Sequence, residues 1–192
     1  MTETSARNTE TPCSRVIVRP VEDADMSAVS DIYAHHVLHG KASFEEMPPT
    51  EVDMCDRRDA LLDGGYPYLV AETDGQVVGY AYAGAYRPRP AYRNTVENSV
   101  YVAPGQEGNG VGTALLEDII QRCEATGFRQ MIAIIGDSGN DGSIALHARC
   151  GFYPVGIMKS VGFKHGVWLD SVVMQRPLGP GDTILPEILR VK

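Results

Sequence analysis

The spacing of hydrophobic and polar residues along the chain predicts alternating strands and helices. The stretch VIVRPV at residues 16–21 indicates a short strand, and Asp23 stands where a side chain would cap the helix that follows. A second helix is expected over residues 51–62, because Gly64 and Gly65 would end it. One face of the first helix would carry Val29, Ile32, Tyr33, His36 and Val37.

A hairpin, a further strand and a long helix are expected in the middle of the chain. The stretches YLVAET and VVGYAYAGAY are separated by Asp74-Gly75, a strong signal for two antiparallel strands joined by a tight turn. Another strand, ENSVYV, leads into the glycine-rich stretch at residues 104–112. Apolar residues then recur every three or four positions up to Gly127, which predicts a helix that follows the glycines directly.

The remaining elements complete a mixed α/β fold. MIAIIG indicates a buried strand, NDGSIALHARCG a short helix, and FYPVGIM and VWLDSVVMQ two final strands. We therefore expect a mixed, mostly antiparallel central sheet of about seven strands flanked by four helices. We expect one domain over residues 15–178, between a disordered tail at residues 1–14 and a C-terminal tail at residues 179–192.

Composition and charge exclude several classes of partner. The 192 residues carry a formal net charge of −8, which would repel nucleic-acid phosphates and anionic membrane surfaces. The N-terminal stretch has no apolar segment of signal-peptide length, and no stretch is as long as a membrane span. The four cysteines lack the spacing of a metal site or a disulfide scaffold, so we expect reduced thiols and a cytoplasmic location.

The glycine-rich stretch between a strand and a helix is the most informative feature of the chain. Gly108, Gly110 and Gly112 would let the backbone approach a phosphate, and the first N–H groups of the helix have no acceptor within it. A purely structural turn is the alternative. A dinucleotide-binding fold would place this turn in an early strand-helix-strand unit, and a P-loop would require Gly-Lys followed by Ser or Thr. The sequence fits neither of those two patterns.

With these residues in place, the sequence resembles the GNAT acetyltransferases. Their acetyl-CoA signature, Gln/Arg-x-x-Gly-x-Gly/Ala, corresponds here to residues 107–112, where Glu107 replaces Gln or Arg. The resemblance implies acetyl-CoA as cosubstrate and no metal. It also implies an irregularity in the preceding strand that frees a backbone N–H for the thioester carbonyl. The residues implied to contact the cofactor are Val100, Tyr101, Val102, Glu107, Gly108, Asn109, Gly110, Val111, Gly112 and Asn140.

Within this superfamily the chain is similar to the phosphinothricin and methionine sulfoximine acetyltransferases over residues 16–177. The similarity is carried by YLVAETDGQVVGYAYAG, AYRNTVENSVYV, SIALHARCGF and VGFKHGVWLD. The family implies a small amino-acid analogue whose α-amine is acetylated, and we also expect a homodimer. An acetyltransferase of another small amine or of a protein N-terminus, and a non-catalytic acyl-CoA-binding module, are the alternatives.

Two side chains are candidates for proton transfer. Glu97 matches the position of the family's general base, which takes a proton from the incoming amine. His147 stands where a tyrosine that protonates the leaving thiolate is common in the superfamily; a packed or orienting histidine is the alternative. Asn140 would cap the short helix.

Positive charge near the amine site is expected from the loop RPRPAYRN. Arg87, Arg89 and Arg93 precede Glu97, and a guanidinium can bind a carboxylate through two hydrogen bonds. The family resemblance implies that the acceptor contacts Phe44, Arg87, Arg89, Tyr92 and Lys164, with His165 beside Lys164. An acidic pocket for a polyamine is disfavoured by these arginines.

Overall fold

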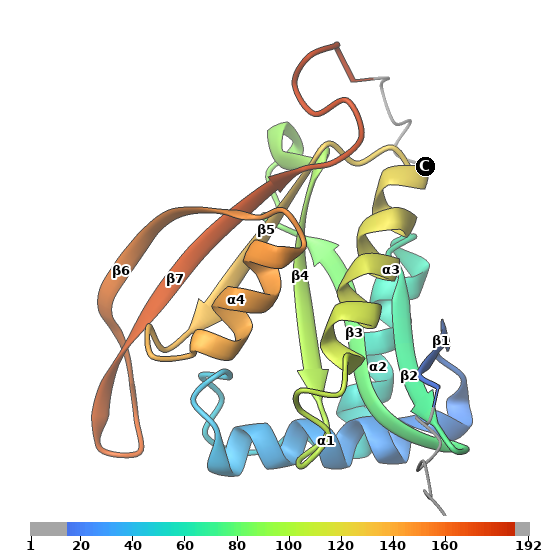
Figure 1. Cartoon of the computed structure of the whole chain (residues 1–192), viewed down its shortest axis with the longest axis vertical. Helices are drawn as coiled ribbons and strands as arrows, with labels where there is room; N and C mark the ends of the chain where they lie inside the picture. The colour runs from blue at the N-terminus through green and yellow to red at the C-terminus, as the bar shows by residue number, and fades with distance from the viewer. Residues whose placement is uncertain (1–14, 187–192) are drawn as a thin grey trace, which may run out of the picture.

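In the computed structural model, which describes residues 15–186, seven strands form one sheet in the order β1-β2-β3-β4-β5-β7-β6 (Figure 1). All neighbours are antiparallel except β4 and β5, which are parallel. The strands are β1 (Ile17–Pro20), β2 (Tyr68–Thr73), β3 (Gln76–Ala85), β4 (Thr95–Val102), β5 (Gln130–Gly136), β6 (Tyr153–Lys164) and β7 (Val167–Pro177). The predicted tail at residues 1–14 lies outside the described residues, as do residues 187–192 of the C-terminal tail.

Four α-helices cover the two faces of the sheet, as the sequence predicted. They are α1 (Met26–His39), α2 (Glu51–Asp63), α3 (Val111–Ala125) and α4 (Asp141–Arg149). The apolar side of α3 packs with β-strand residues in one core cluster, and α1 and α2 pack on residues of β2 and β3 in another. Within residues 15–186 no helix has the length and apolar character needed to cross a membrane.

The hairpin predicted at Asp74-Gly75 is confirmed. Asp74 and Gly75 both have positive φ, at 51° and 78°, the conformation required by a two-residue turn of type I′. β2 and β3 pair in antiparallel register on either side of it. This hairpin places a row of tyrosines on the face that α1 and α2 cover.

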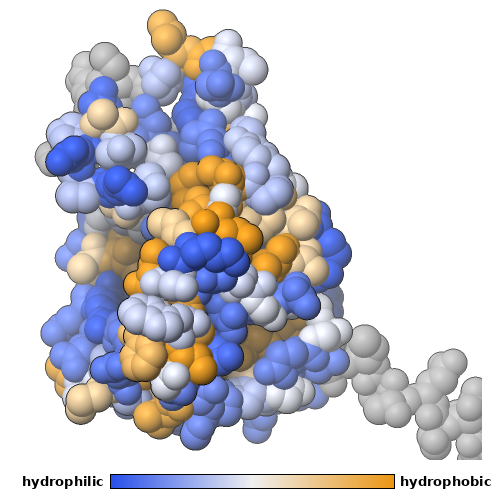
Figure 2. Space-filling model, turned by 90° about the vertical axis from the view of Figure 1, so that its left-hand side faces the viewer, coloured by the Kyte–Doolittle hydropathy of each residue, from blue (hydrophilic) through white to orange (hydrophobic). Residues whose placement is uncertain are grey.

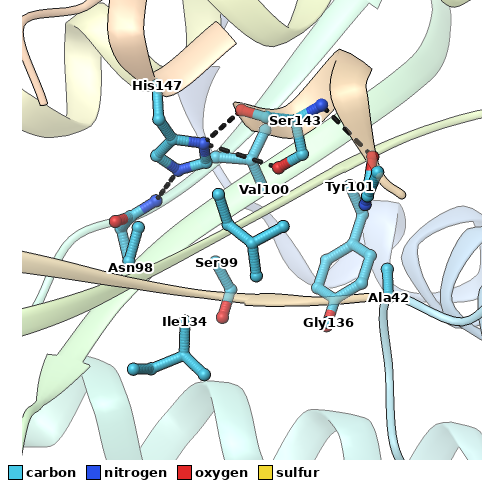
Figure 3. Close-up of a pocket in the computed structure, with 12 residues that line it drawn as sticks. Ala42, Asn98, Ser99, Val100, Tyr101, Ile134, Gly136, Ser143 and His147 are labelled. Carbon is cyan, nitrogen blue, oxygen red and sulfur yellow. Dashed lines mark hydrogen bonds between the residues drawn. The ribbon is translucent and has the colours of Figure 1, made fainter. Parts of the chain in front are cut away.

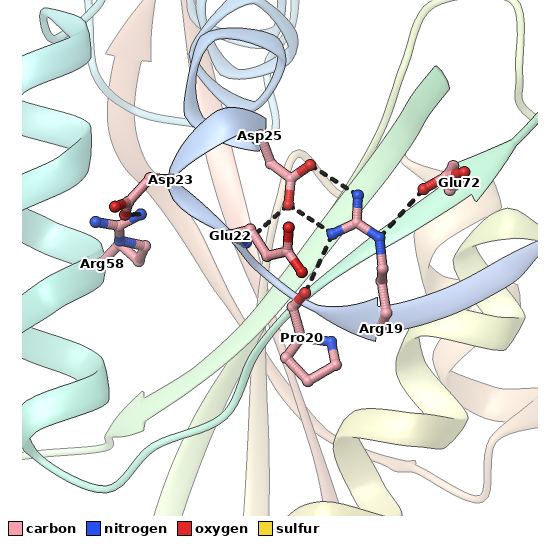
Figure 4. Close-up of polar contacts among 7 residues, drawn as sticks. All are labelled: Arg19, Pro20, Glu22, Asp23, Asp25, Arg58 and Glu72. Carbon is pink, nitrogen blue, oxygen red and sulfur yellow. Dashed lines mark hydrogen bonds and ion pairs between the residues drawn. The ribbon is translucent and has the colours of Figure 1, made fainter. Parts of the chain in front are cut away.

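The start of α1 differs from the prediction. Asp23 does not cap this helix, because it begins a short 3-10 helix at Asp23–Asp25 that precedes α1. At the start of this 3-10 helix, the carboxylate of Asp25 accepts a hydrogen bond from the backbone N–H of Glu22 at 2.8 Å. Arg19 of β1 donates to Asp25 at 2.7 and 2.8 Å and to Glu72 of β2 at 3.1 Å (Figure 4). This network, which lowers the pKa of Asp25, fastens the edge strand to the start of α1.

The last two strands form a long hairpin that extends beyond the helices (Figure 1). β6 runs to Lys164, six residues further than predicted, because β7 continues to pair with it across a register shift between Met158 and Gly162. Figure 2 faces this hairpin and shows apolar residues gathered over it. Its exposed apolar side chains are Tyr153, Val155, Ile157, Met158, Val161, Phe163, Val167 and Trp168.

Candidate active site

β4 and β5 separate part of the way along their length, and this separation opens the sheet. Their parallel pairing ends at Asn98 and Ala133. β4 continues to Val102 and β5 to Gly136, but the two strands diverge (Figure 1). One edge of β4 therefore lies open beyond Asn98.

The backbone of β4 presents its polar groups to this opening. The Ala103 N–H donates to the Val78 carbonyl of β3 at 2.9 Å, and residues of an antiparallel ladder alternate in direction. Val100 and Val102 therefore point their N–H and C=O groups away from β3. The described β3–β4 ladder runs from Val96 to Val102 without a register shift, so the irregularity implied by the resemblance is wrong for this ladder. Divergence from β5, and not a bulge, frees these groups.

Two connected cavities occupy the opening. The first, which we call the inner cavity, has a volume of about 50 Å³ and is bordered by Ser99, Val100 and Ile134, among others (Figure 3). Ala42, from the segment between α1 and α2, closes one side of it. The inner cavity therefore has room for a small group only.

The second cavity, which we call the outer cleft, has a volume of about 460 Å³ and extends to the N-terminus of α3. Asn109 and Val111, which were predicted to contact the cofactor, do not border it; Val111, the first residue of α3, packs into the core. The other predicted cofactor residues do border it: Val100, Tyr101, Val102, Glu107, Gly108, Gly110, Gly112 and Asn140.

The N-terminus of α3 is suited to bind an anion. Gly108 and Gly110 have φ values of 80° and 83°, which glycine adopts without steric cost. Gly110 is the N-cap of α3, and no described side chain caps it, so the first N–H groups of the helix remain available. A Cβ on Gly112 would lie 3.1 Å from the Leu146 side chain, so glycine at this position also lets α4 pack closely against the start of α3.

Several residues that border the outer cleft were missed by sequence reasoning, and three of them bear on cofactor binding. Arg149 lies at the end of α4 and supplies positive charge that the glycine-rich loop lacks. Thr113 lies in the first turn of α3. His36 of α1 comes from far away in the sequence, and its Nε2 lies 2.9 Å from the Val102 carbonyl. Arg149 lies seven residues, or two helical turns, after Gly142, which borders the same cleft, whereas only the tertiary fold reveals His36.

Glu97 lies on the face of β4 that carries Tyr101, opposite the face of Val100, as the predicted alternation requires. It is paired across the ladder with Gly84, which has no side chain. Burial raises the pKa of Glu97, and the positive charge of Arg87 opposes this rise. A carboxylate with a raised pKa is a stronger base than an exposed one.

His147 is buried, and both of its ring nitrogens have partners (Figure 3). Nδ1 lies 2.8 Å from the Ser143 carbonyl and must donate to it, while Nε2 lies 3.0 Å from Asn98 Nδ2 and accepts from it. Burial lowers the pKa of His147, which favours this neutral form. The geometry therefore directs no ring N–H of His147 toward the inner cavity, in contrast to the proton donor implied by the resemblance.

Asn140 caps α4, as predicted. Its side-chain oxygen accepts from the Ser143 N–H at 3.2 Å. Asn140 and Ser143 both border the inner cavity and the outer cleft. The start of α4 therefore joins the two cavities.

The predicted acceptor residues fall into two groups around the opening. Arg87 lies over the rings of Tyr86 and Tyr92, 5.1 and 5.7 Å from their centres, and its charge reaches Glu97. Arg89 is exposed and precedes the 3-10 helix Pro90–Tyr92. Within this group the charge of Arg87 acts on Glu97, and Arg87, Arg89 and Tyr92 border neither the inner cavity nor the outer cleft.

The second group lies in and beneath the segment between α1 and α2. Phe44 packs on Gly162 of β6 and is partly exposed. Lys164 is buried, and its Nζ donates to the Ser43 carbonyl of the same chain at 2.7 Å. Lys164 thus supports the segment that carries Ala42 and Phe44, and it borders neither the inner cavity nor the outer cleft.

Comparisons with known proteins find similar sequences. The family model described as Acetyltransferase (GNAT) family matches residues 31–152. A phosphinothricin N-acetyltransferase from Alcaligenes faecalis is 59% identical over 88% of this chain and 86% of its own length. An L-methionine sulfoximine/L-methionine sulfone acetyltransferase from Pseudomonas paraeruginosa is 43% identical over 85% of this chain and 95% of its own.

A solved structure shares the fold closely. The crystal structure of a GNAT superfamily phosphinothricin acetyltransferase from Sinorhizobium meliloti, in complex with AcCoA, has a TM-score of 0.88 and 47% sequence identity. The match covers 91% of this chain and 94% of that chain.

Proposed function

This chain belongs to the GNAT acetyltransferase family and is an acetyl-CoA-dependent N-acetyltransferase, and we propose that its acceptor is the α-amine of a small amino-acid analogue. Phosphinothricin and methionine sulfoximine, named for similar proteins, represent this acceptor class. One observation carries the proposal: the open backbone of β4 lies between the available N-terminus of α3 and the carboxylate of Glu97.

The cavities fit the parts of acetyl-CoA. The first N–H groups of α3 would hold the diphosphate, with Arg149 adding positive charge at the outer cleft. The Val100 carbonyl and the N–H and C=O groups of Val102 would bind the amides of the pantetheine arm as a neighbouring strand does. The inner cavity, at about 50 Å³, suits the acetyl group.

Glu97 is proposed as the general base. The acceptor arrives as an ammonium ion, which cannot attack until it loses a proton, and the Glu97 carboxylate takes that proton directly or through water. The Val100 N–H points into the opening, where it can stabilise negative charge that develops on the thioester oxygen. As the new C–N bond forms and the C–S bond breaks, the nitrogen loses a second proton, which the sulfur gains through water.

His147 is proposed as a positioning residue, because its Nε2 accepts from Asn98. Asn98 is the last residue of β4 paired with β5, so this bond fixes the strand where the opening begins. The neutral ring, fixed by the Ser143 carbonyl, cannot give a proton from Nε2. The predicted role of His147 in proton transfer is therefore revised in this proposal.

Arg87 and Arg89 are proposed to bind the carboxylate of the acceptor. Their loop lies beside Glu97, and Arg87 is held over two tyrosine rings, which limits its freedom. Tyr92 and Phe44 would form walls of the acceptor site. A polyamine, which has no carboxylate, would not match these positive charges.

The test is a CoA-release assay on the purified protein with a panel of amines. We expect phosphinothricin and methionine sulfoximine to have a kcat/KM at least about tenfold above those of a peptide N-terminus and spermidine. Turnover of the peptide or the polyamine in preference to both amino-acid analogues would overturn the proposed acceptor class.

We also propose that the enzyme is a cytoplasmic homodimer. The apolar side chains exposed on the β6–β7 hairpin support self-association, because a surface of this kind commonly marks an interface (Figure 2). The free thiols of Cys55, Cys123 and Cys150 support a reducing compartment.

A further inference from the structure

The inner cavity and the outer cleft meet at five residues that border both of them: Ala42, Val100, Tyr101, Asn140 and Ser143. The proposed function places the acetyl group of acetyl-CoA in the inner cavity and its pantetheine arm in the outer cleft. The sulfur atom joins these two parts of the molecule, so it lies where the cavities meet. A side chain at this junction can therefore contact the sulfur.

Three of the five residues have polar side chains, and two of these are engaged elsewhere. The side-chain oxygen of Asn140 accepts from the Ser143 N–H at 3.2 Å and caps α4. The ring of Tyr101 packs on those of Tyr33 and Tyr80, with centres 5.2 and 5.1 Å away, on the face of the sheet covered by α1 and α2. The third is Ser143, in the first turn of α4 on the opposite face.

The surroundings of the Ser143 hydroxyl leave its hydrogen available. Its oxygen lies 3.5 Å from Nδ1 of His147, and the hydrogen on this nitrogen points to the Ser143 carbonyl at 2.8 Å. A ring nitrogen that carries a hydrogen cannot accept another one, so the hydroxyl does not donate to His147. Figure 3 shows the hydroxyl oxygen turned from α4 toward Val100. The hydroxyl can therefore donate into the junction of the two cavities.

A departing thiolate needs a hydrogen-bond donor, and His147 does not supply one. As the C–S bond breaks, its electron pair stays on the sulfur, and negative charge develops there in a partly enclosed site. Both ring nitrogens of His147 are occupied, by Asn98 and by the Ser143 carbonyl. A hydrogen bond to an anion is stronger than one between neutral groups. A donor at the junction would therefore speed the departure of CoA.

We propose that the Ser143 hydroxyl donates a hydrogen bond to the sulfur of acetyl-CoA and stabilises the thiolate as CoA leaves. This inference rests on the proposed function and adds a catalytic residue to it. The serine keeps its own proton, because an alcohol is a far weaker acid than a thiol, and the proton that neutralises the sulfur still arrives through water. His147 positions this donor, since its Nδ1 hydrogen bond fixes the Ser143 carbonyl.

The first experiment measures the ionisation of CoA bound to the protein, which requires no turnover. The ultraviolet absorbance of the thiolate is followed against pH in the complex with CoA. We expect Ser143→Ala to lower the acid dissociation constant of the bound thiol about tenfold, because the anion loses one hydrogen bond. The substitution keeps the backbone N–H and carbonyl that bind Asn140 and His147, so α4 should remain folded. Unchanged ionisation of the thiol would overturn the inference.

Ser99→Ala is the matched control for this titration. Ser99 borders the inner cavity but not the outer cleft, so its hydroxyl lies away from the junction. We expect the bound thiol to ionise in this variant as it does in the wild type. A change as large as that in Ser143→Ala would mean that the titration reports the polarity of the inner cavity in general, and the assignment to Ser143 would be wrong.

The second experiment separates departure of CoA from binding. We expect Ser143→Ala to lower kcat about tenfold, while the KM for phosphinothricin and the Kd for acetyl-CoA each stay within about twofold of the wild type. A weaker affinity for acetyl-CoA with unchanged ionisation of the bound thiol would show that Ser143 binds the pantetheine arm and not the sulfur. That result would overturn the inference.

The outcomes distinguish this inference from the proposed function. If phosphinothricin is acetylated and Ser143→Ala matches the wild type in thiol ionisation and in kcat, only the assignment of Ser143 fails. If CoA binds but no amine causes its release from acetyl-CoA, the proposed function fails, and the thiol titration still decides whether Ser143 contacts the sulfur. If CoA does not bind, both fail.

Discussion

At the level of single residues, burial and Arg87 act in opposite directions on the pKa of Glu97, and burial is the larger effect. Because the carboxylate is the active form, activity should be lost as the pH falls through this raised pKa. The acidic limb of kcat should therefore lie above the ordinary glutamate pKa of about 4.3. Measuring kcat against pH with saturating phosphinothricin checks this expectation.

The substitution Glu97→Gln tests the same residue without a change of shape. We expect kcat to fall at least about a hundredfold, while the Kd for acetyl-CoA in calorimetry stays within about twofold. Glu107→Gln is the matched control, since Glu107 borders the outer cleft and lies far from the amine. Unchanged turnover in Glu97→Gln would remove this residue from the mechanism.

His36 offers a second prediction at this scale. Val102 points its carbonyl into the opening, and His36 is the side chain that binds it, at 2.9 Å. The His36 ring also lies 5.4 Å from that of Tyr101, so it holds the end of β4 from two sides. We expect His36→Phe to raise the KM for acetyl-CoA about three- to tenfold and to change kcat less. An increase of this size corresponds to the net free energy of one hydrogen bond.

The control for this prediction is His39→Phe, because His39 is an exposed residue of the same helix. His36→Gln retains a donor and should recover part of the affinity for acetyl-CoA. Tighter binding of acetyl-CoA to His36→Phe would mean that His36 competes with the cosubstrate for the Val102 carbonyl, and the positioning role would be wrong.

Among the elements, those specified by local signals were predicted well. The turn at Asp74-Gly75 and the helix after the glycines depend on backbone conformations that their own residues dictate. The start of α1 was misplaced, because Asp25 is held by Arg19, a partner from another element. The extension of β6 to Lys164 was missed since it depends on continued pairing with β7.

In the candidate site, too, local sequence signals predicted some features and missed those that depend on tertiary contacts. Motif resemblance found the residues of β4 that border the outer cleft, and those of the glycine-rich loop except Gln106. It did not find His36, because no local pattern links α1 to β4. Nor did it show that the ring nitrogens of His147 are occupied by Ser143 and Asn98, which requires the packed structure.

The turn before α3 carries a prediction at the scale of an element. Gly110 has a φ of 83°, so Gly110→Ala places a Cβ in the left-handed region, at a cost of about 1 kcal/mol in the free energy of unfolding. The turn should also relax, moving the first N–H groups of α3 and raising the Kd for acetyl-CoA. Urea unfolding and calorimetry measure the two effects.

Gly156→Ala is the control for the helix-start prediction. A Cβ on Gly156 meets nothing within 4 Å, and its φ is not positive. We expect this variant to match the wild type in both measurements. Wild-type affinity for acetyl-CoA in Gly110→Ala would argue against capture of the diphosphate by the backbone of this turn.

For the whole molecule, the β6–β7 hairpin is the part that the fold leaves uncovered. The sequence predicted apolar strands here but not their exposure, because burial depends on whether a helix covers them. Phe163 and Trp168 pair across the two strands and remain 56% and 67% exposed. A stable interface of about 800 Å² on each partner would remove such side chains from water.

The dimer can be tested by measuring mass in solution. Light scattering should give about twice the chain mass of 20.8 kDa at micromolar concentration. The double substitution Val161→Glu and Trp168→Glu places charges on the hairpin, and we expect it to shift the mass to that of one chain. Val52→Glu, on α2, should remain dimeric because it adds a charge to an exposed apolar position away from the hairpin. A wild-type mass of one chain would contradict the dimer, and a dimeric double variant would move its interface to another surface.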